Sequence, residues 1–156
     1  VEAWVDNSKR RRSWPYETLY RTILSGKPDA EIAVLGLAYK EDTHSINNSP
    51  SLALVGQWES KNVQVYDPVV PASVVPGVRG CLSALEAVKG ADAVAIMTPW
   101  AEFRNLDPKD INAAMTGSVL LDPFKVLDHR SVTSAGLDYY TLGVSCETVA
   151  EEVHRC

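Results

Sequence analysis

The stretch from Glu31 to Pro50, EIAVLGLAYKEDTHSINNSP, sets the architecture of this chain. It opens with the unbroken apolar run 32–35, which is typical of a strand buried on both faces of a parallel sheet. Gly36 follows, and then a polar loop that contains a lysine. Ser49 and Pro50 supply the N-cap side chain and the first-turn proline of the next helix. A strand, a lysine-bearing loop and a new helix N-terminus together predict an anion-binding corner at the end of the strand.

Segments of strand length and segments of helical periodicity alternate through the rest of the chain. This alternation predicts an α/β fold, a doubly wound, Rossmann-like parallel sheet with helices on both faces, preceded by an N-terminal helical segment. The stretch Val69 to Gly80, rich in proline and glycine, is expected to be a loop. The expected strands are 31–37, 62–68, 92–97, 118–122 and 137–142, and the expected helix starts are Ser13, Ser49, Ser83, Asp107 and Asp128.

Composition narrows the class of protein. The 156 residues are enough for one domain with a core, and a net charge of −5 excludes a uniformly basic nucleic-acid binder. The chain lacks an apolar run of the roughly 20 residues needed to span a bilayer, so no membrane partner is expected. The three cysteines are odd in number and lack metal-ligand spacing, so we expect no metal site and a reducing, cytoplasmic setting.

The N-terminal segment has an apolar face with no local partner, formed by Val1, Trp4 and Val5. We therefore expect residues 1–28 to be a helical linker from an upstream domain. Residues 29–146 are expected to form the domain that contains the predicted sheet and its anion-binding corner, and residues 147–156 to form a tail. An uncovered face of this kind favours a homodimer, because two-fold pairing is the commonest way to bury it.

The ligand of the corner is not a dinucleotide held in the usual way. That mode needs G-x-G-x-x-G at the first turn and an acid about 20 residues further on. Here the turn has one glycine, and the nearest acid at a strand end, Asp67, lies well beyond that spacing. Lys40 and Thr43 offer instead a cation and a hydroxyl for a diphosphate. The alternative, that the loop is a solvated connection with a surface lysine, stays open at this point.

The residues resemble those of a known family. The segment 32–50, IAVLGLAYKEDTHSINNSP, is similar to IAVLGLAFKPNTDDIRESP of the UDP-glucose/GDP-mannose dehydrogenases. Further matching motifs follow in the family's order: Val65-Tyr66-Asp67-Pro68, Gly90-Ala91-Asp92-Ala93-Val94, Thr98-Pro99-Trp100 with Glu102-Phe103, and the late stretch Asp122 to Asp128. The resemblance covers most of 31–143 and indicates the C-terminal, nucleotide-sugar-binding domain of such an enzyme.

Enzymes of this family oxidise the C6 hydroxyl of a nucleotide-sugar to a carboxylate with NAD, through a cysteine-bound thioester. The resemblance implies that the NAD domain and the catalytic cysteine lie upstream, so no catalytic residue is expected in this chain. None of Cys81, Cys146 and Cys156 has a basic neighbour at a spacing that favours a thiolate. A UDP-sugar is the expected substrate, and NAD is the expected cofactor of the full-length enzyme.

The resemblance also implies roles for particular residues. Tyr39 and Lys40 match the family's aromatic-lysine pair, and Thr43 matches its threonine; these are expected to contact the nucleotide-sugar. The family arginine in the late stretch falls on Phe124 or Lys125, and Lys125 keeps the cation. Asn47 stands where a family arginine reaches the NAD, and it keeps hydrogen bonding but loses the charge.

Two other functions remain as alternatives. One is an NAD-binding domain of another oxidoreductase or a regulator, and the other is an interaction module whose ligand site has decayed. Four residues in the matching motifs also have structural interpretations: Trp100 and Phe103 as packing residues, Asp67 as a cap of the loop that follows it, and Asp122 as a buried structural acid.

Overall fold

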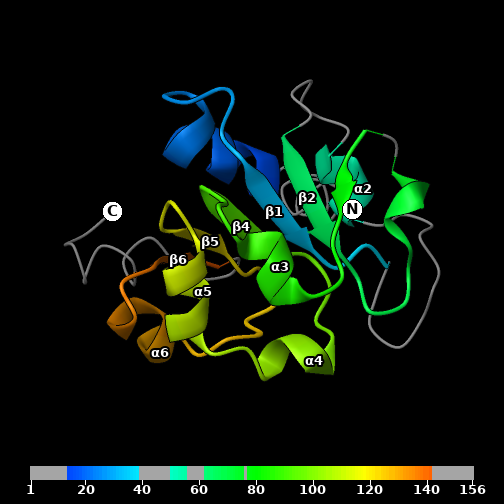
Figure 1. The fold of residues 1–156 in the computed structure, drawn as a ribbon. Coiled ribbons are helices and arrows are strands. Elements are labelled where there is room, and N and C mark those ends of the chain that lie inside the picture. Colours follow the sequence, from blue (N-terminus) through cyan, green and yellow to red (C-terminus); the bar gives the residue numbers. More distant parts are fainter. Residues whose placement is uncertain (1–13, 39–49, 56–61, 76, 142–156) are drawn as a thin grey trace, which may run out of the picture.

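Six parallel strands form one sheet at the centre of the molecule (Figure 1). The computed structural model describes residues 14–38, 50–55, 62–75 and 77–141. The strand order is β3-β2-β1-β4-β5-β6, so the chain winds outward from β1 to one edge and then from β4 to the other. This is the order of doubly wound nucleotide-binding sheets, and it confirms the predicted fold class. The strands are β1 (Ile32–Leu35), β2 (Val63–Tyr66), β3 (Arg79–Gly80), β4 (Ala93–Ile96), β5 (Val119–Leu121) and β6 (Asp138–Tyr140).

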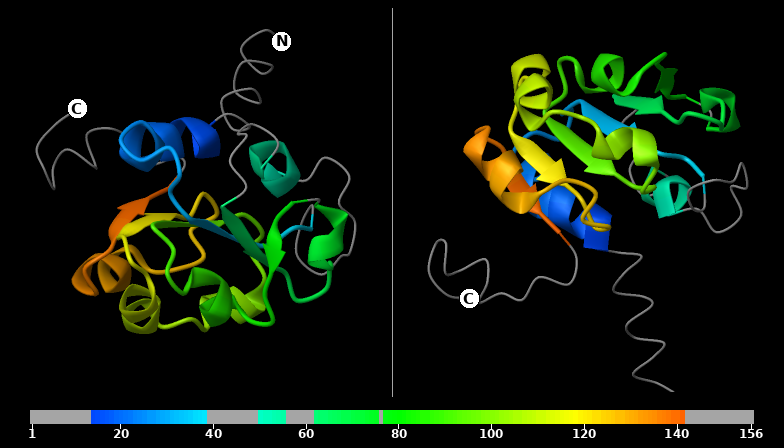
Figure 2. Two further views of the ribbon diagram at one scale, coloured as in Figure 1. Left: turned by 45° about the horizontal axis from the view of Figure 1, so that its top comes forward. Right: turned by 90° about the horizontal axis from the view of Figure 1, so that it is seen from below.

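Helices cover both faces of the sheet (Figure 2). On one face α3 packs against β1 and β2, and it also contacts α5. The helix at 14–24 and α2 lie on the opposite face, and α6 packs beside β6. Residues 14–24 are helical throughout, and the final turn, η1 (Tyr20–Leu24), is a π-helix. The other helices are α2 (Pro50–Val55), the 3₁₀ turn η2 (Ala72–Val74), α3 (Ala84–Val88), α4 (Ala101–Arg104), α5 (Pro108–Ala114) and α6 (His129–Ser134).

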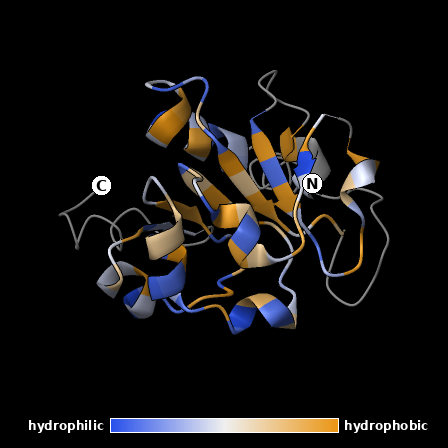
Figure 3. Cartoon of the chain, viewed as in Figure 1, coloured by the Kyte–Doolittle hydropathy of each residue, from blue (hydrophilic) through white to orange (hydrophobic). Residues whose placement is uncertain are grey.

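The two central strands are buried completely, as their apolar sequences predict. Every residue of β1 and β4 is buried, and β1 pairs with both β2 and β4, with Val34 opposite Val65 on one side and Ala95 on the other. Burying one Val, Leu or Ile side chain stabilises a fold by roughly 1.5–3 kcal/mol. Apolar residues therefore concentrate in the strands and polar ones on the outer helix faces (Figure 3).

Three predicted helix starts are confirmed by their capping hydrogen bonds. Ser83 accepts from the amide of Glu86, Asp107 from the amide of Lys109, and Asp128 from the amide of Ser131. Each bond satisfies one of the amide groups that the first turn of a helix leaves without a partner.

The prediction of a loop from Val69 to Gly80 was wrong. This stretch contains η2 and the edge strand β3, in which Arg79 lies opposite Gln64 of β2. The guanidinium of Arg79 donates to the side-chain oxygen of Gln64, a residue that is only 4% exposed. A strand of two residues is too short for a periodic pattern, and its pairing with a distant strand is what stabilises it. The short helix α4 was also not predicted.

The division of the chain at residue 28 remains a prediction. Leu19 and Leu24 of the N-terminal helix belong to the same apolar core as the sheet, with 0% and 5% exposure. Asp92, before β4, joins this region to the sheet through Lys27 at 3.1 Å and the amide of Glu31 at 2.9 Å. The expected apolar face of Val1, Trp4 and Val5 lies outside the described residues.

Candidate functional site

The carboxyl ends of β1 and β4 meet at the point where the strand order reverses. The chain leaves β1 towards α2 on one face and leaves β4 towards α4 and α5 on the other (Figure 2). Open α/β sheets bind their ligands at the carboxyl edge, beside the point where the strand order reverses. The candidate site is therefore built from the turns that follow the strands.

The turn after β1 is packed tightly against the turn after β4. Gly36 has a φ of +100°, and a Cβ placed there would lie 2.5 Å from the side chain of Thr98. The hydroxyl of Thr98 donates to the carbonyl of Ala38 at 2.9 Å, and both residues are fully buried. A glycine is required here because an L side chain rarely adopts that φ and no space remains for one.

A single buried carboxylate holds this turn. Oδ2 of Asp67 accepts hydrogen bonds from the amides of Leu37 at 2.6 Å and Ala38 at 3.0 Å, and from the indole nitrogen of Trp100 at 3.0 Å. Its Oδ1 accepts from the amides two and three residues further along the chain, each at 2.8 Å. The expected capping role of Asp67 is thus confirmed, and Trp100, 7% exposed, is a packing residue as predicted.

These bonds bear directly on dinucleotide binding. In the usual mode the amides of the first turn face the pyrophosphate and the acid after the second strand binds the ribose. Here the amide of Gly36 donates to the carbonyl of Tyr66, and the next two amides donate to Asp67. The described part of this turn has no amide left for a pyrophosphate, and its acid is already occupied. Within residues 36–38, the backbone amides that the usual dinucleotide mode would use therefore donate to groups of the protein itself.

A second buried carboxylate organises the turn after β5. Asp122 is 0% exposed; its Oδ1 accepts from the amide of Val126 at 2.8 Å, and its Oδ2 accepts from the amide of Leu127 at 2.8 Å. The hydroxyl of Tyr139 lies 2.9 Å from the same Oδ2. Burial raises the pKa of Asp122, while these three donors and the charge of Arg104 oppose the rise. Asp122 is the buried structural acid that the sequence predicted.

A cavity of about 480 Å³ lies beside this turn. The aromatic ring of Tyr139 stacks on the imidazole of His129, with centroids 5.0 Å apart and ring planes at 27°. Burial and the charge of Asp122 raise the pKa of Tyr139 above its usual value. The cavity is lined by Lys125, Val126, Leu127, Asp128, His129, Tyr139 and Thr141.

Of the predicted site residues, Lys125 alone lies within the part of the chain that the structure describes. Its side chain is exposed and lines the cavity, whereas Phe124 is not among the lining residues. Its φ is +54°. Among the described residues, no other residue except glycine has a positive φ. Tyr39, Lys40, Thr43 and Asn47 lie outside the described residues.

The sequence did not single out Tyr139 or His129. Tyr139 lies 17 residues from its partner Asp122, and no local pattern links the two. The one available signal was the acid that ends β5, whose carboxylate needs donors once it is buried.

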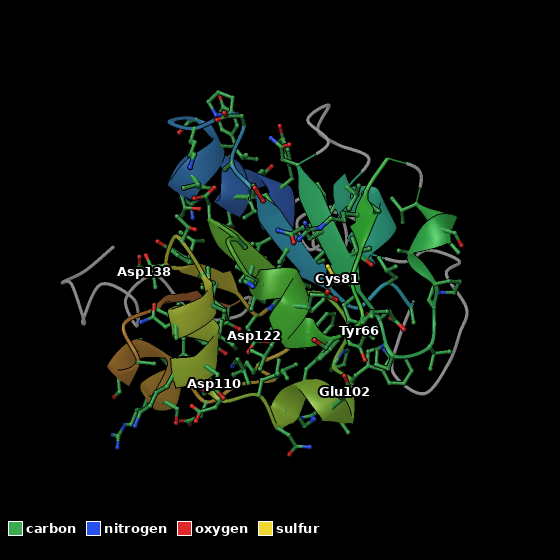
Figure 4. All side chains as sticks on the ribbon, in the orientation of Figure 1. Tyr66, Cys81, Glu102, Asp110, Asp122 and Asp138 are labelled. Carbon is green, nitrogen blue, oxygen red and sulfur yellow. The ribbon has the colours of Figure 1, made fainter. Side chains whose placement is uncertain are left out.

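A further polar contact lies at the end of β2. The hydroxyl of Tyr66 donates to Glu102 of α4 at 2.7 Å, and the two side chains point towards one another in Figure 4. Burial and the neighbouring carboxylate of Glu102 raise the pKa of Tyr66 to about 12. The ring of Tyr66 also meets Phe103 edge-on at 6.2 Å. Phe103 is 0% exposed, which agrees with its prediction as a packing residue.

Cys81, the cysteine within the described ranges, is free and half-buried. Its pKa is raised, chiefly by burial, which opposes formation of a thiolate. Cys146 and Cys156 lie outside the described residues. The described part of the chain contains no cluster of three His, Cys, Asp or Glu side chains arranged to hold a metal. Among its helices, none combines the length and apolar character that crossing a bilayer requires.

Comparison with known proteins agrees with this architecture. Residues 33–129 match the model of the UDP-glucose/GDP-mannose dehydrogenase family, UDP binding domain. A UDP-glucose 6-dehydrogenase of Rickettsia conorii is 29% identical over 151 residues, which cover 92% of this chain and 35% of the relative. A UDP-N-acetyl-D-mannosamine dehydrogenase of Pyrococcus horikoshii is 39% identical over 107 residues, or 67% of this chain and 24% of the relative.

Solved structures share the fold. The UDP-D-ManNAc dehydrogenase of Pyrococcus horikoshii superposes with a TM-score of 0.71 at 29% identity, covering 86% of this chain and 31% of that one. A UDP-glucose dehydrogenase of Pyrobaculum islandicum has the same fold, with a TM-score of 0.70 at 20% identity. The chain spans about a third of the length of these relatives. It belongs to the UDP-glucose/GDP-mannose dehydrogenase family and corresponds to the family's UDP-binding domain.

Proposed function

We propose that this chain is the nucleotide-sugar-binding part of an NAD-dependent nucleotide-sugar 6-dehydrogenase, with a UDP-sugar as its substrate. The observation that carries the proposal is the cavity at the carboxyl edge, where Lys125 adds a cation to a wall formed by Tyr139 and His129. This cavity lies at the end of β5 and is lined mainly by residues within or just beyond the segment that matches the family model.

The binding chemistry follows from the side chains. The ammonium group of Lys125 supplies positive charge for a diphosphate, although as a single point charge and without the paired donors of an arginine. Tyr39, Lys40 and Thr43 are assigned to the same ligand by the resemblance to the family. Side chains supply the charge because the described amides of the turn after β1 are already hydrogen-bonded within the protein.

NAD belongs to the whole enzyme in this proposal and is bound mainly by an upstream domain. The occupied turn after β1 supports that assignment, since it leaves no usual dinucleotide site among the described residues. Asn47 is assigned the remaining contact with the cofactor. No catalytic residue is assigned to this chain, and the raised pKa of Cys81 agrees with that.

The assembly and location are part of the same proposal. Residues 1–28 link an upstream domain to the binding domain at 29–146, and a tail follows at 147–156. Together with NAD-binding and middle domains the chain forms a homodimeric enzyme of the cytoplasm. The odd number of cysteines supports a reducing compartment.

Calorimetric titration of the 156-residue chain with UDP, and separately with NAD, tests the proposal. We expect UDP to bind weakly and NAD to give no measurable heat. Lys125→Ala should weaken UDP binding by roughly 1.5–3 kcal/mol, the value of a hydrogen bond to a charged group. The matched control is Lys89→Ala, because Lys89 is an exposed lysine at the C-terminus of α3, outside the cavity lining.

Three outcomes contradict the proposal. Binding of NAD without UDP favours the alternative of a self-contained NAD domain. The absence of binding by either nucleotide favours an interaction module. Equal UDP affinity in Lys125→Ala and the parent chain places the site elsewhere.

A further inference from the structure

Asp122 and Lys125 are coupled through the backbone between them. The amide of Lys125 lies 3.2 Å from the carbonyl oxygen of Asp122, and the next amide, that of Val126, lies 2.8 Å from the carboxylate of the same residue. Two successive amides converge on one residue only if the backbone between them bends sharply. The φ of +54° at Lys125 supplies that bend.

This conformation is unfavourable for a lysine. In the left-handed region the Cβ of any residue other than glycine lies too close to the following carbonyl oxygen. Such residues persist when the surrounding structure holds them, and they concentrate at ligand sites. The amides of Val126 and Leu127 enclose the Asp122 carboxylate as an anion is enclosed by a backbone nest, and these bonds hold the bend in place.

Asp122 also contacts a second residue of the cavity lining, Tyr139. Its Oδ2 lies 2.9 Å from the hydroxyl of Tyr139, and that hydroxyl lies 3.1 Å from the carbonyl of Leu127. The ring that carries this hydroxyl stacks on His129. One fully buried carboxylate therefore contacts both the turn that presents Lys125 and the strand that presents the aromatic wall.

We propose that Asp122 is the positioning residue of this site: it forces Lys125 into the left-handed conformation that presents its ammonium group at the cavity, and it orients Tyr139 in the lining of the same cavity. Asp122 does not touch the ligand and acts through these two residues. The proposal rests on the proposed function in one respect, the identity of UDP as the ligand.

The first test measures conformation and needs no ligand. A positive φ brings the amide and α protons of a residue close together, so the intraresidue nuclear Overhauser effect between them is strong at Lys125 in the parent chain. We expect Asp122→Asn to weaken it to the level of ordinary residues, because an amide cannot accept at both of its former oxygen positions. Lys89, with a φ of −64°, is the internal reference and should not change.

The second test is a double-mutant cycle with UDP as the probe. Asp122→Asn should raise the dissociation constant about fivefold or more, within the usual range of coupling between contacting residues. In the Lys125→Ala background the same substitution should have a smaller effect, because one of the two residues through which Asp122 acts is gone. A merely structural acid would weaken binding equally in both backgrounds.

Tyr139→Phe is the second variant, used if Asp122→Asn does not fold. It removes only the hydroxyl and keeps the ring stacked on His129. We expect a partial loss of the Lys125 signal and a smaller rise in the dissociation constant. The proposal is overturned if Lys125 keeps its positive φ when Asp122 or Tyr139 is changed, or if the cycle shows no coupling. Failure of UDP to bind the parent chain refutes the proposed function, while the conformational result still decides the role of Asp122.

Discussion

The indole nitrogen of Trp100 lies 3.0 Å from a carboxylate oxygen of Asp67, so a residue that follows β4 donates to a buried acid that follows β2. β1 lies between those two strands in the sheet, and its turn donates to the same oxygen through Leu37 and Ala38. Three neighbouring strand ends thus share one acceptor. None of the described lysines and arginines forms an ion pair with Asp67, and N–H groups donate to both of its carboxylate oxygens.

Trp100→Phe should destabilise the fold by about 1–2 kcal/mol. The phenyl ring retains most of the packing, but the carboxylate loses one donor in a buried position, where a missing partner is costly. Urea denaturation followed by circular dichroism measures the change. Trp14→Phe is the control, since Trp14 is only partly buried, and its effect should be smaller. Equal effects of the two substitutions would show that the bond to Asp67 contributes little.

Gly36→Ala should cost roughly 2–5 kcal/mol, the sum of a left-handed backbone penalty and an overpacking penalty. The added methyl group would lie 2.5 Å from two side-chain atoms of Thr98. Gly26→Ala is the matched control, because a Cβ there meets no atom within 4 Å. The control should leave stability unchanged or raise it slightly. Thermal unfolding of both variants separates the two cases.

Lys125→Gly should raise the free energy of unfolding by about 0.5–1 kcal/mol while weakening UDP binding. Glycine adopts positive φ without strain, and this gain exceeds its larger entropy loss on folding. Lys89→Gly, at an ordinary φ, should lower stability and leave UDP affinity unchanged. A gain in stability together with a loss of UDP affinity in Lys125→Gly would show that the strained backbone at residue 125 serves ligand binding. A lower free energy of unfolding in Lys125→Gly would show that the backbone at residue 125 is not strained.

The stability of the chain should fall as the pH rises from about 10 to about 12. The folded pKa of Tyr66 is about 12, above the usual value of 10.0. In this window the unfolded chain has lost the tyrosine proton and the folded chain still holds it, so higher pH favours unfolding. The stability that the raised pKa contributes is fully present below pH 10 and is lost as the pH passes the folded pKa.

Tyr66→Phe removes this titration. The difference in unfolding free energy between the parent chain and Tyr66→Phe should therefore be constant up to about pH 10 and shrink above it. Glu102→Gln removes a carboxylate that raises the folded pKa, so it should lower the upper end of the window while the lower end stays at about pH 10. A difference that stays constant through pH 12 would show that Tyr66 titrates normally.

The chain alone should form no NADH from any UDP-sugar. The described turn after β1 offers no free amide for a dinucleotide, and burial raises the pKa of Cys81. Absorbance at 340 nm with purified protein, NAD and UDP-glucose measures this. Sustained NADH formation that follows the protein through purification would overturn the assignment of catalysis to upstream domains.

Local signals in the sequence were enough for most of the fold. The apolar run of β1 and the caps Ser83, Asp107 and Asp128 are properties of a few adjacent residues, and the structure confirms them. The edge strand β3 was missed because two residues carry no period, and its pairing depends on a contact between Arg79 and Gln64.

The site was harder to predict than the fold. Lys125 was found through its place in a family motif, whereas its left-handed conformation depends on bonds to a side chain three residues earlier. Tyr139 reaches that same side chain from the last strand of the sheet. Such relationships arise only when the strands assemble, and no short segment of sequence records them.

The closed set of bonds around Asp67 has an evolutionary consequence. In some sheets the backbone amides of the first turn bind the ligand directly. The glycines of such a turn are then needed both for the backbone conformation and for ligand recognition. Here the amides of the described turn serve the fold alone. The contacts proposed for the ligand come from side chains, which can be exchanged one at a time without disturbing the turn. Under this proposal, a change of ligand requires no change in the backbone of the turn at residues 36–38.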